Sequence, residues 1–121
     1  GTVRFSGTAL KKYQDNGGTG MNVTFSMVGT TLTVVLEGEL DHHNIKDVRE
    51  VIDLRIERAR PSHLIMDLRG VPFSDSSGIA LVLGRYKLMA AAKGSMEIRN
   101  VSPQIKKIFL LSGVDKLMAV R

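Results

Sequence analysis

The spacing of apolar residues switches repeatedly along this chain between every second residue and every third or fourth residue. The order of these segments constrains the fold more than any other feature of the sequence. Apolar and polar residues alternate over 23–27, and a second β-rich run follows over 32–36. Gly29-Thr30 separates the two runs, so we expect them to form an antiparallel hairpin. Helical spacing then replaces the alternation: apolar residues recur every three or four positions over 45–59, until Pro61 ends the helix.

The two periods continue to alternate through the rest of the chain. A short apolar run is typical of a buried strand, and Ser102-Pro103 is a strong helix start because serine caps a helix and proline suits its first position. The elements expected after the first helix are a strand over 64–68, a helix over about 76–92, a strand near 96–98, a helix from 103 to about 113 and a strand over 117–120.

The order of these elements is β-β-α-β-α-β-α-β. Strands separated by helices pair in parallel, while the opening hairpin adds an antiparallel pair. The sequence therefore predicts an α/β fold, in which a mixed β-sheet of about four to five strands with an initial hairpin is flanked by α-helices.

Residues 1–20 differ from the rest of the chain in composition. They end in the glycine-rich run Asn16-Gly17-Gly18-Thr19-Gly20. We expect an N-terminal extension or cloning-derived segment with a flexible linker over 1–20, and one folded domain over 21–121. An alternative is a strand end at Val3-Arg4-Phe5 followed by a short helix over 6–13.

Composition argues against several classes of protein. No apolar run approaches the roughly 20 residues of a bilayer span, so no membrane partner is expected. The chain has no cysteine, which removes disulfides and thiolate sites, fits a reducing compartment and leads us to expect a cytoplasmic protein. The net charge is +5, but basic residues are interspersed with acids and aromatic residues for base stacking are few. We therefore expect a solvated basic surface or an acidic protein partner rather than nucleic acid.

The stretch Asp75-Ser76-Ser77-Gly78 is the strongest candidate for chemistry. It lies at a strand-to-helix junction, where unpaired N–H groups and the positive end of the helix dipole favour a phosphate. Phosphorylation of a serine there would add about −1.5 to −2 charges and strong hydrogen-bond acceptors, while the fold should survive. On composition alone the ordinary alternative, that these serines only cap a helix, comes first.

Other kinds of site fit less well. A catalytic serine needs a base and an orienting acid, and histidines are present at 42, 43 and 63. The nucleophile elbow, however, requires glycine two positions before the serine, where this chain has Ser74. Adjacent His42 and His43 cannot share one metal from a helix, and no nucleotide-binding motif is present. We expect no metal, no cofactor and no enzymatic activity.

Two motifs together resemble the STAS domain. They are Gly38-Glu39-Leu40-Asp41-His42-His43 and Asp75-Ser76-Ser77-Gly78, the latter followed by Leu83-Gly84-Arg85-Tyr86-Lys87. Either motif alone is weak. In this order and spacing they resemble the bacterial anti-sigma factor antagonists, and most closely those of the sporulation anti-sigma F type. The resemblance covers residues 21–120.

This resemblance implies a partner switch in the regulation of transcription. The unphosphorylated antagonist binds an anti-sigma factor that is also a serine kinase, and displaces the sigma factor. The kinase phosphorylates the first serine after the aspartate, here Ser76, and the complex dissociates until a serine phosphatase removes the phosphate. By position, Asp41, Asp75, Ser77 and Gly78 would form the docking surface together with Ser76.

Three points stay open at this stage. The same fold could be a STAS interaction module of another signalling assembly, such as a stress-sensing complex. A small serine hydrolase would need a histidine near Ser76. Family members usually continue past the last strand into a further helix, whereas this chain stops at Arg121. One expectation is therefore that residues 5–15 supply that helix.

Overall fold

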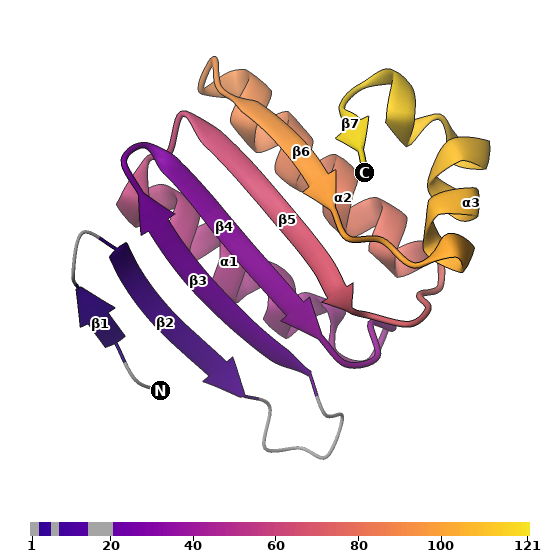
Figure 1. The fold of residues 1–121 in the computed structure, drawn as a ribbon, viewed down its shortest axis with the longest axis horizontal. Helices are drawn as coiled ribbons and strands as arrows, with labels where there is room; N and C mark the ends of the chain where they lie inside the picture. The colour runs from indigo at the N-terminus through magenta and orange to yellow at the C-terminus, as the bar shows by residue number, and fades with distance from the viewer. Residues whose placement is uncertain (1–2, 6–7, 15–20) are drawn as a thin grey trace.

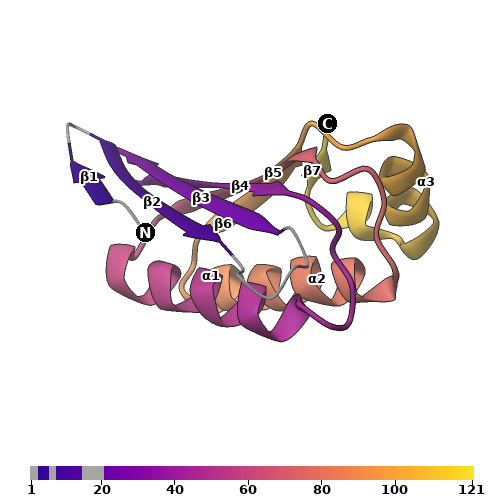
Figure 2. The same ribbon diagram turned by 90° about the horizontal axis from the view of Figure 1, so that it is seen from below.

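The structure, a computed structural model, describes residues 3–5, 8–14 and 21–121. The described residues form one seven-stranded sheet with its strands in chain order, and helices pack on one of its faces (Figure 1, Figure 2). The elements are β1 (Val3–Phe5), β2 (Thr8–Gln14), β3 (Asn22–Val28), β4 (Thr31–Glu37), α1 (Ile45–Ala59), β5 (His63–Gly70), α2 (Ser76–Ala91), β6 (Ser95–Arg99), α3 (Pro103–Ser112), the 3₁₀ turn η1 (Val114–Lys116) and β7 (Ala119–Val120).

Strand pairing changes from antiparallel to parallel at β4. Strands β1 to β4 pair antiparallel, and β4 to β7 pair parallel. The expected hairpin is confirmed, because Val28 pairs with Thr31 and the intervening Gly29 has a φ of 59°, which glycine adopts without steric cost. The α/β fold with a mixed sheet and flanking helices is also confirmed, and five of its strands, β3 to β7, come from residues 21–121.

The expectation of a helix over residues 5–15 is wrong. Residues 8–14 form strand β2, which pairs antiparallel with β3 along its whole length. This strand lies across the sheet from β7 (Figure 1), so it cannot replace a helix beyond the last strand. The physical reason is that β3 would otherwise present a row of unpaired N–H and C=O groups, which β2 satisfies.

Strand β2 also tests the alternative of a strand end at Val3–Phe5 followed by a short helix over 6–13. The strand at Val3–Phe5 is confirmed as β1, and the short helix over 6–13 is wrong over 8–13. Residues 6–7 and the expected linker over 15–20 lie outside the described residues. The division of the chain between residues 20 and 21 stays a prediction.

The core lies between the sheet and the helices α1 and α2. Val48 and Ile52 of α1 are buried, on the face that the spacing of three and four predicted. Burying one such aliphatic side chain stabilises a fold by about 1.5–3 kcal/mol, so the contact between sheet and helices dominates stability. The strand side chains buried in this core are Val23, Phe25, Leu32, Val34, Leu36, Leu64, Met66, Leu68, Met96 and Ile98.

The third helix begins as its sequence predicts. The Oγ of Ser102 accepts a hydrogen bond from the N–H of Ile105, Pro103 takes the first helical position, and Gly113 ends the helix with a φ of 83°. Each helix that the structure describes is too short or too polar to cross a membrane.

One charged pair is buried between α1 and α2. The side chain of Arg85 is 6% exposed, and its Nε lies 2.7 Å from Oδ1 of Asp53, whose side chain is 36% exposed. Burial raises the pKa of Asp53 and lowers the pKa of Arg85, in each case against the opposing effect of the partner's charge. Both directions disfavour the charged form. Desolvation therefore outweighs attraction, and the pair fixes the packing of the two helices rather than adding net stability.

Removing one partner of this pair should cost more stability than removing both. Asp53→Ala leaves the buried charge of Arg85 unpaired. We expect the free energy of unfolding to fall by about 3 kcal/mol, the lower end for a buried pair because Asp53 is partly exposed. The double variant Asp53→Leu/Arg85→Met removes both charges and should stay within about 1 kcal/mol of the wild type. Urea unfolding measures both changes, and a double variant less stable than Asp53→Ala would contradict the desolvation argument.

Truncation tests where the domain begins. A chain that starts at Met21 loses β1 and β2 but keeps the buried apolar side chains of the core. We expect it to unfold cooperatively in urea, at a lower midpoint because β3 becomes an edge strand. Circular dichroism during urea titration checks this. A truncated chain without a cooperative transition would show that the domain begins before Met21.

Candidate functional site at the carboxyl edge of the parallel strands

The segments that follow the parallel strands meet at one edge of the sheet. The chain runs from β4 into α1, from β5 into α2 and from β6 into α3, so three helices begin at this edge (Figure 1). Two of these segments touch each other, because Leu40 and Ser74 form an isolated parallel bridge. In open α/β sheets, binding sites form beyond the carboxyl ends of the strands.

Ser76 occupies the first position of α2 and is exposed. The preceding residue, Asp75, is the N-cap, and its Oδ1 accepts a hydrogen bond of 2.8 Å from the N–H of Ser77. Hydrogen bonds from Ser77 lower the pKa of Asp75, with a further contribution from His42. The carboxylate therefore caps the helix, and the neighbouring Ser76 is left at the surface.

Gly78 is buried at this junction because there is no room for a side chain. A Cβ at this position would lie 2.2 Å from the Oγ of Ser74 and 3.6 Å from Cδ2 of Leu40. Its N–H donates to the carbonyl of Asp75 at 3.1 Å. Gly78 thus allows the first turn of α2 to pack directly on the two loops, which supports the site without presenting any group to a partner.

Aspartate is a preferred capping residue, but Asp41 does not cap the first helix, since α1 begins at Ile45 and its N-cap is Asn44. The Oδ1 of Asp41 instead accepts hydrogen bonds from the N–H groups of His43 (2.8 Å) and Asn44 (3.2 Å), and so closes a turn before the helix. Asn44 is buried and fastens this turn, because its Nδ2 donates to the carbonyl of Glu39 at 2.7 Å.

An ion-pair contact joins the two loops at the surface. Nδ1 of His42 lies 3.8 Å from Oδ2 of Asp75, and both side chains are well exposed. A contact of this length between exposed groups contributes little to stability. All five residues predicted from the sequence, Asp41, Asp75, Ser76, Ser77 and Gly78, lie in these two adjoining segments. Their roles in binding and phosphorylation stay predictions.

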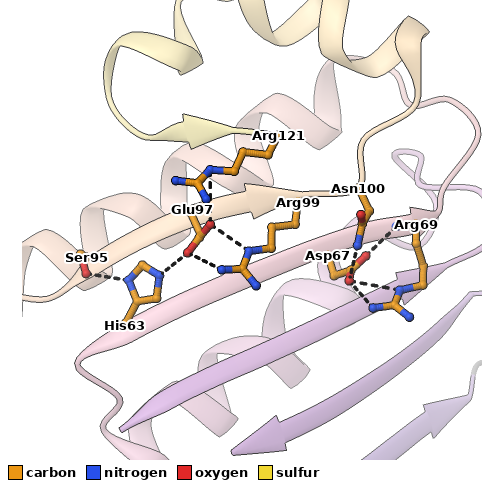
Figure 3. A network of polar contacts seen from close by, with 8 residues as sticks. All are labelled: His63, Asp67, Arg69, Ser95, Glu97, Arg99, Asn100 and Arg121. Carbon is orange, nitrogen blue, oxygen red and sulfur yellow. Dashed lines mark hydrogen bonds and ion pairs between the residues drawn. The ribbon is translucent and has the colours of Figure 1, made fainter. Parts of the chain in front are cut away.

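A polar network covers the face of the sheet opposite α1 and α2, and Figure 3 shows two parts of it. In one part, Asp67 accepts hydrogen bonds from Nε of Arg69 (3.1 Å) and Nδ2 of Asn100 (2.8 Å). Burial raises the pKa of Asp67, but these hydrogen bonds outweigh it and the net shift is downward. This carboxylate therefore ties the end of β5 to the segment that leads into α3.

The other part of the network contains a serine, a histidine and an acid. His63 lies 2.6 Å from Oγ of Ser95 and 2.8 Å from Oε1 of Glu97 (Figure 3). Hydrogen bonds from Arg99 and His63 lower the pKa of Glu97. The N–H of Ser95 is already bonded to the carbonyl of Ser62 at 3.0 Å, so this N–H is not free to serve as one of the oxyanion donors that a serine hydrolase requires.

Neither a hydrolase pair nor a metal cluster occurs at the site itself. Within residues 21–121, no hydrogen bond joins a histidine to Ser76. The same described part of the chain contains no group of three or more histidine, cysteine or acidic side chains arranged to hold a metal ion. The geometry is that of an exposed surface with one presented hydroxyl.

Two features of this edge were not singled out from the sequence. Phe73, two residues before Asp75, is 55% exposed. Ser102 was recognised only as a helix cap, but its Oγ also donates to the carbonyl of Pro72 at 3.0 Å. An aromatic residue immediately before a helix start is a weak signal, because sequence alone does not distinguish it from buried phenylalanines such as Phe25.

Comparisons with known proteins agree with one another. The family model of the STAS domain matches residues 23–121. The anti-sigma F factor antagonist of Paenibacillus polymyxa is 39% identical over 89 residues, which cover 74% of this chain and 76% of that protein. The unphosphorylated anti-sigma factor antagonist SpoIIAA is similar in structure, with a TM-score of 0.71 and 34% identity over 82% of this chain and 87% of that one. The phosphorylated form of SpoIIAA from Bacillus matches with a TM-score of 0.66 and 34% identity, over 82% and 90% of the two chains. The resemblance drawn from the two motifs is confirmed.

The cap of α2 should contribute stability that depends on pH. The pKa of Asp75 is lowered in the folded chain, so its contribution is present above the unfolded value of about 3.9 and is lost as pH falls through the folded value. We expect Asp75→Ala to lower the urea midpoint at pH 7 and to approach the wild type as the pH falls toward about 2. Asp75→Asn keeps an acceptor and should recover part of the loss. A difference between wild type and Asp75→Ala that stays constant over this pH range would contradict the assignment.

Proposed function

Because the chain belongs to the STAS domain family, within the anti-sigma factor antagonists, we propose that it is a non-enzymatic antagonist of an anti-sigma factor serine kinase. In its unphosphorylated form it binds this kinase and releases the sigma factor. Phosphorylation of Ser76 ends the interaction. The observation that carries the proposal is the exposed position of Ser76 at the start of α2, where the loops after β4 and β5 adjoin. This role places the protein in the cytoplasm, with the transcription machinery.

Burial and capping favour Ser76 over Ser77 as the phosphorylated residue. Ser76 is exposed, whereas Ser77 is half-buried and donates its N–H to the capping carboxylate of Asp75. A kinase must bring the serine oxygen in line with the γ-phosphorus of ATP. The oxygen then bonds to that phosphorus, the bond to the bridging oxygen breaks, the hydroxyl proton passes to a base of the kinase, and ADP leaves. Ser76 meets this requirement without any rearrangement of the helix start.

Charge on the docking surface indicates how the kinase recognises it. The whole chain has a net charge of +5, yet the two segments that adjoin at Leu40 and Ser74 carry the acidic residues Glu39, Asp41 and Asp75. Acidic groups on an otherwise basic protein favour basic side chains on the partner and increase the rate of association. We therefore include Asp41, Asp75, Ser77 and Gly78 in the docking surface, the last two as the support of the helix start.

The phosphate acts on the interface and leaves the fold in place. At the N-terminus of α2, the phosphate is stabilised by the positive end of the helix dipole. In the complex, the same group of about −1.5 to −2 charges would face the surface of the kinase and occupy volume between two packed surfaces. Repulsion and bulk therefore separate the partners. A serine phosphatase that hydrolyses phospho-Ser76 restores the binding form, and the antagonist needs no cofactor of its own.

The phosphorylation site can be tested by intact mass after incubation with ATP and the anti-sigma F factor of Paenibacillus polymyxa. We expect the wild type to gain a single phosphate and Ser76→Ala to gain none while still binding, because removing the hydroxyl leaves the docking surface intact. Ser77→Ala is the matched control and should be phosphorylated like the wild type. Labelling of Ser76→Ala at full stoichiometry would overturn the assignment of the site.

The charge-based switch needs a separate variant. Ser76→Asp places a permanent negative charge at the start of α2 and should weaken the complex with the kinase, as measured by calorimetry. Unchanged affinity would contradict the switch mechanism. Failure of the wild type to bind any anti-sigma factor, together with retention of a different signalling protein on an affinity column, would favour the alternative of a STAS module in another assembly.

A further inference from the structure

An aromatic side chain stands out on the docking surface. Phe73 lies between β5 and the cap of α2 and is 55% exposed, whereas Phe25 and Phe109 are buried in the core. Pro72, the residue before it, is exposed as well. Aromatic side chains are enriched among the residues that dominate binding energy at interfaces, so an exposed phenylalanine at a proposed binding surface is a candidate contact point for a partner. Phe73 has no role in capping α2 or in presenting Ser76, so its exposure is not explained by the site described above.

The segment that carries Phe73 is held in place at both ends. On one side, the N–H of Val71 donates to the carbonyl of Leu68 at 3.0 Å, and the carbonyl of Pro72 accepts from Oγ of Ser102 at 3.0 Å. On the other side, Ser74 forms the bridge to Leu40. A backbone segment that is already ordered loses little conformational entropy on binding, and so more of the burial energy of Phe73 appears as affinity.

We propose that Phe73 is the apolar anchor of the docking surface, and that the kinase receives it in an apolar recess bordered by basic side chains. The proposal rests on the function proposed above and names the chemistry of the partner. The basic border follows from the acidic residues Glu39, Asp41 and Asp75 of the two adjoining segments. Hot spots of interfaces are buried aromatic residues surrounded by polar groups, which is the arrangement offered here.

The anchor also explains why one phosphate is an effective switch. Phe73 stands three positions before Ser76, so a partner that buries the aromatic ring is brought against the serine. A phosphate on Ser76 then holds the two surfaces apart at the point where the ring must enter its recess. The loss of affinity includes the burial of Phe73 as well as the repulsion between charges.

Calorimetry with the anti-sigma F factor of Paenibacillus polymyxa tests the anchor. We expect Phe73→Ala to weaken binding about thirtyfold or more, while Phe73→Leu, which keeps an apolar side chain, retains most of the affinity. Leu88→Ala is the matched control, because Leu88 is 42% exposed near the other end of α2, and its binding should equal that of the wild type. Urea midpoints of all variants should be close to the wild type, since both residues are exposed and neither belongs to the core cluster.

A second pair of variants tests the ordering of the segment. Ser102→Asp keeps an acceptor for the N–H of Ile105 but loses the hydroxyl that donates to Pro72, so it should weaken binding about threefold by loosening the segment that carries Phe73. Ser112→Ala removes a comparable hydrogen bond, to the carbonyl of Phe109 at the far end of α3, and should leave binding unchanged.

The outcomes separate the anchor from the proposed function. If the wild type binds the kinase and Phe73→Ala binds it with the same affinity, the anchor is overturned and the proposed function stands. Equal losses in Phe73→Ala and Leu88→Ala would also overturn it, because the effect would not belong to the docking surface. Absence of wild-type binding would overturn the proposed function itself, and the anchor with it.

Discussion

The parallel pairing of β4 with β5 is the constraint on which the rest of the site depends. At the end of this pair the N–H of Gly38 donates to the carbonyl of Gly70 at 2.8 Å. A Cβ on Gly70 would lie 2.8 Å from Cα of Glu37, so only glycine permits the approach. Because the two strands run in the same direction, their following segments leave at the same edge, and Leu40 meets Ser74. Without this pairing, the two sequence motifs would have no reason to be neighbours.

Much of the fold could be predicted because its signals are local. The turn at Gly29, the end of the first helix before Pro61 and the start of the third at Ser102-Pro103 each depend on the dihedral preference or hydrogen bonding of one or two residues. Strand β2 could not be predicted in this way. Its pairing with β3 is a property of the sheet, and a segment of mixed polar and apolar residues reads equally well as the start of a helix.

In the site too, some features depend on residues that are neighbours in the sequence, and others depend on contacts between segments far apart in the sequence. The sequence pattern suggests the serines as possible caps of the second helix, whereas the structure has Asp75 as the N-cap. Asp41 is also a good capping residue, but Asn44 reaches the carbonyl of Glu39 and moves the start of α1 beyond it. The exposure of Phe73 and the second hydrogen bond of Ser102 depend on which segments happen to adjoin. Pattern and propensity carry no information about such contacts.

In the proposed function, the group that caps the helix and the group that is phosphorylated are different, and this separation suits a reversible switch. The carboxylate of Asp75 satisfies the N–H of Ser77, while the fold is held by a core beneath α2 that does not involve Ser76. Adding a phosphate to Ser76 therefore removes no hydrogen bond on which the fold depends. The proposed phosphorylation would then act at the surface, on the affinity for a partner that contacts Phe73 and Ser76 together. A rigid domain can in this way change its affinity without changing its conformation, and removal of the phosphate restores the binding surface with no refolding step.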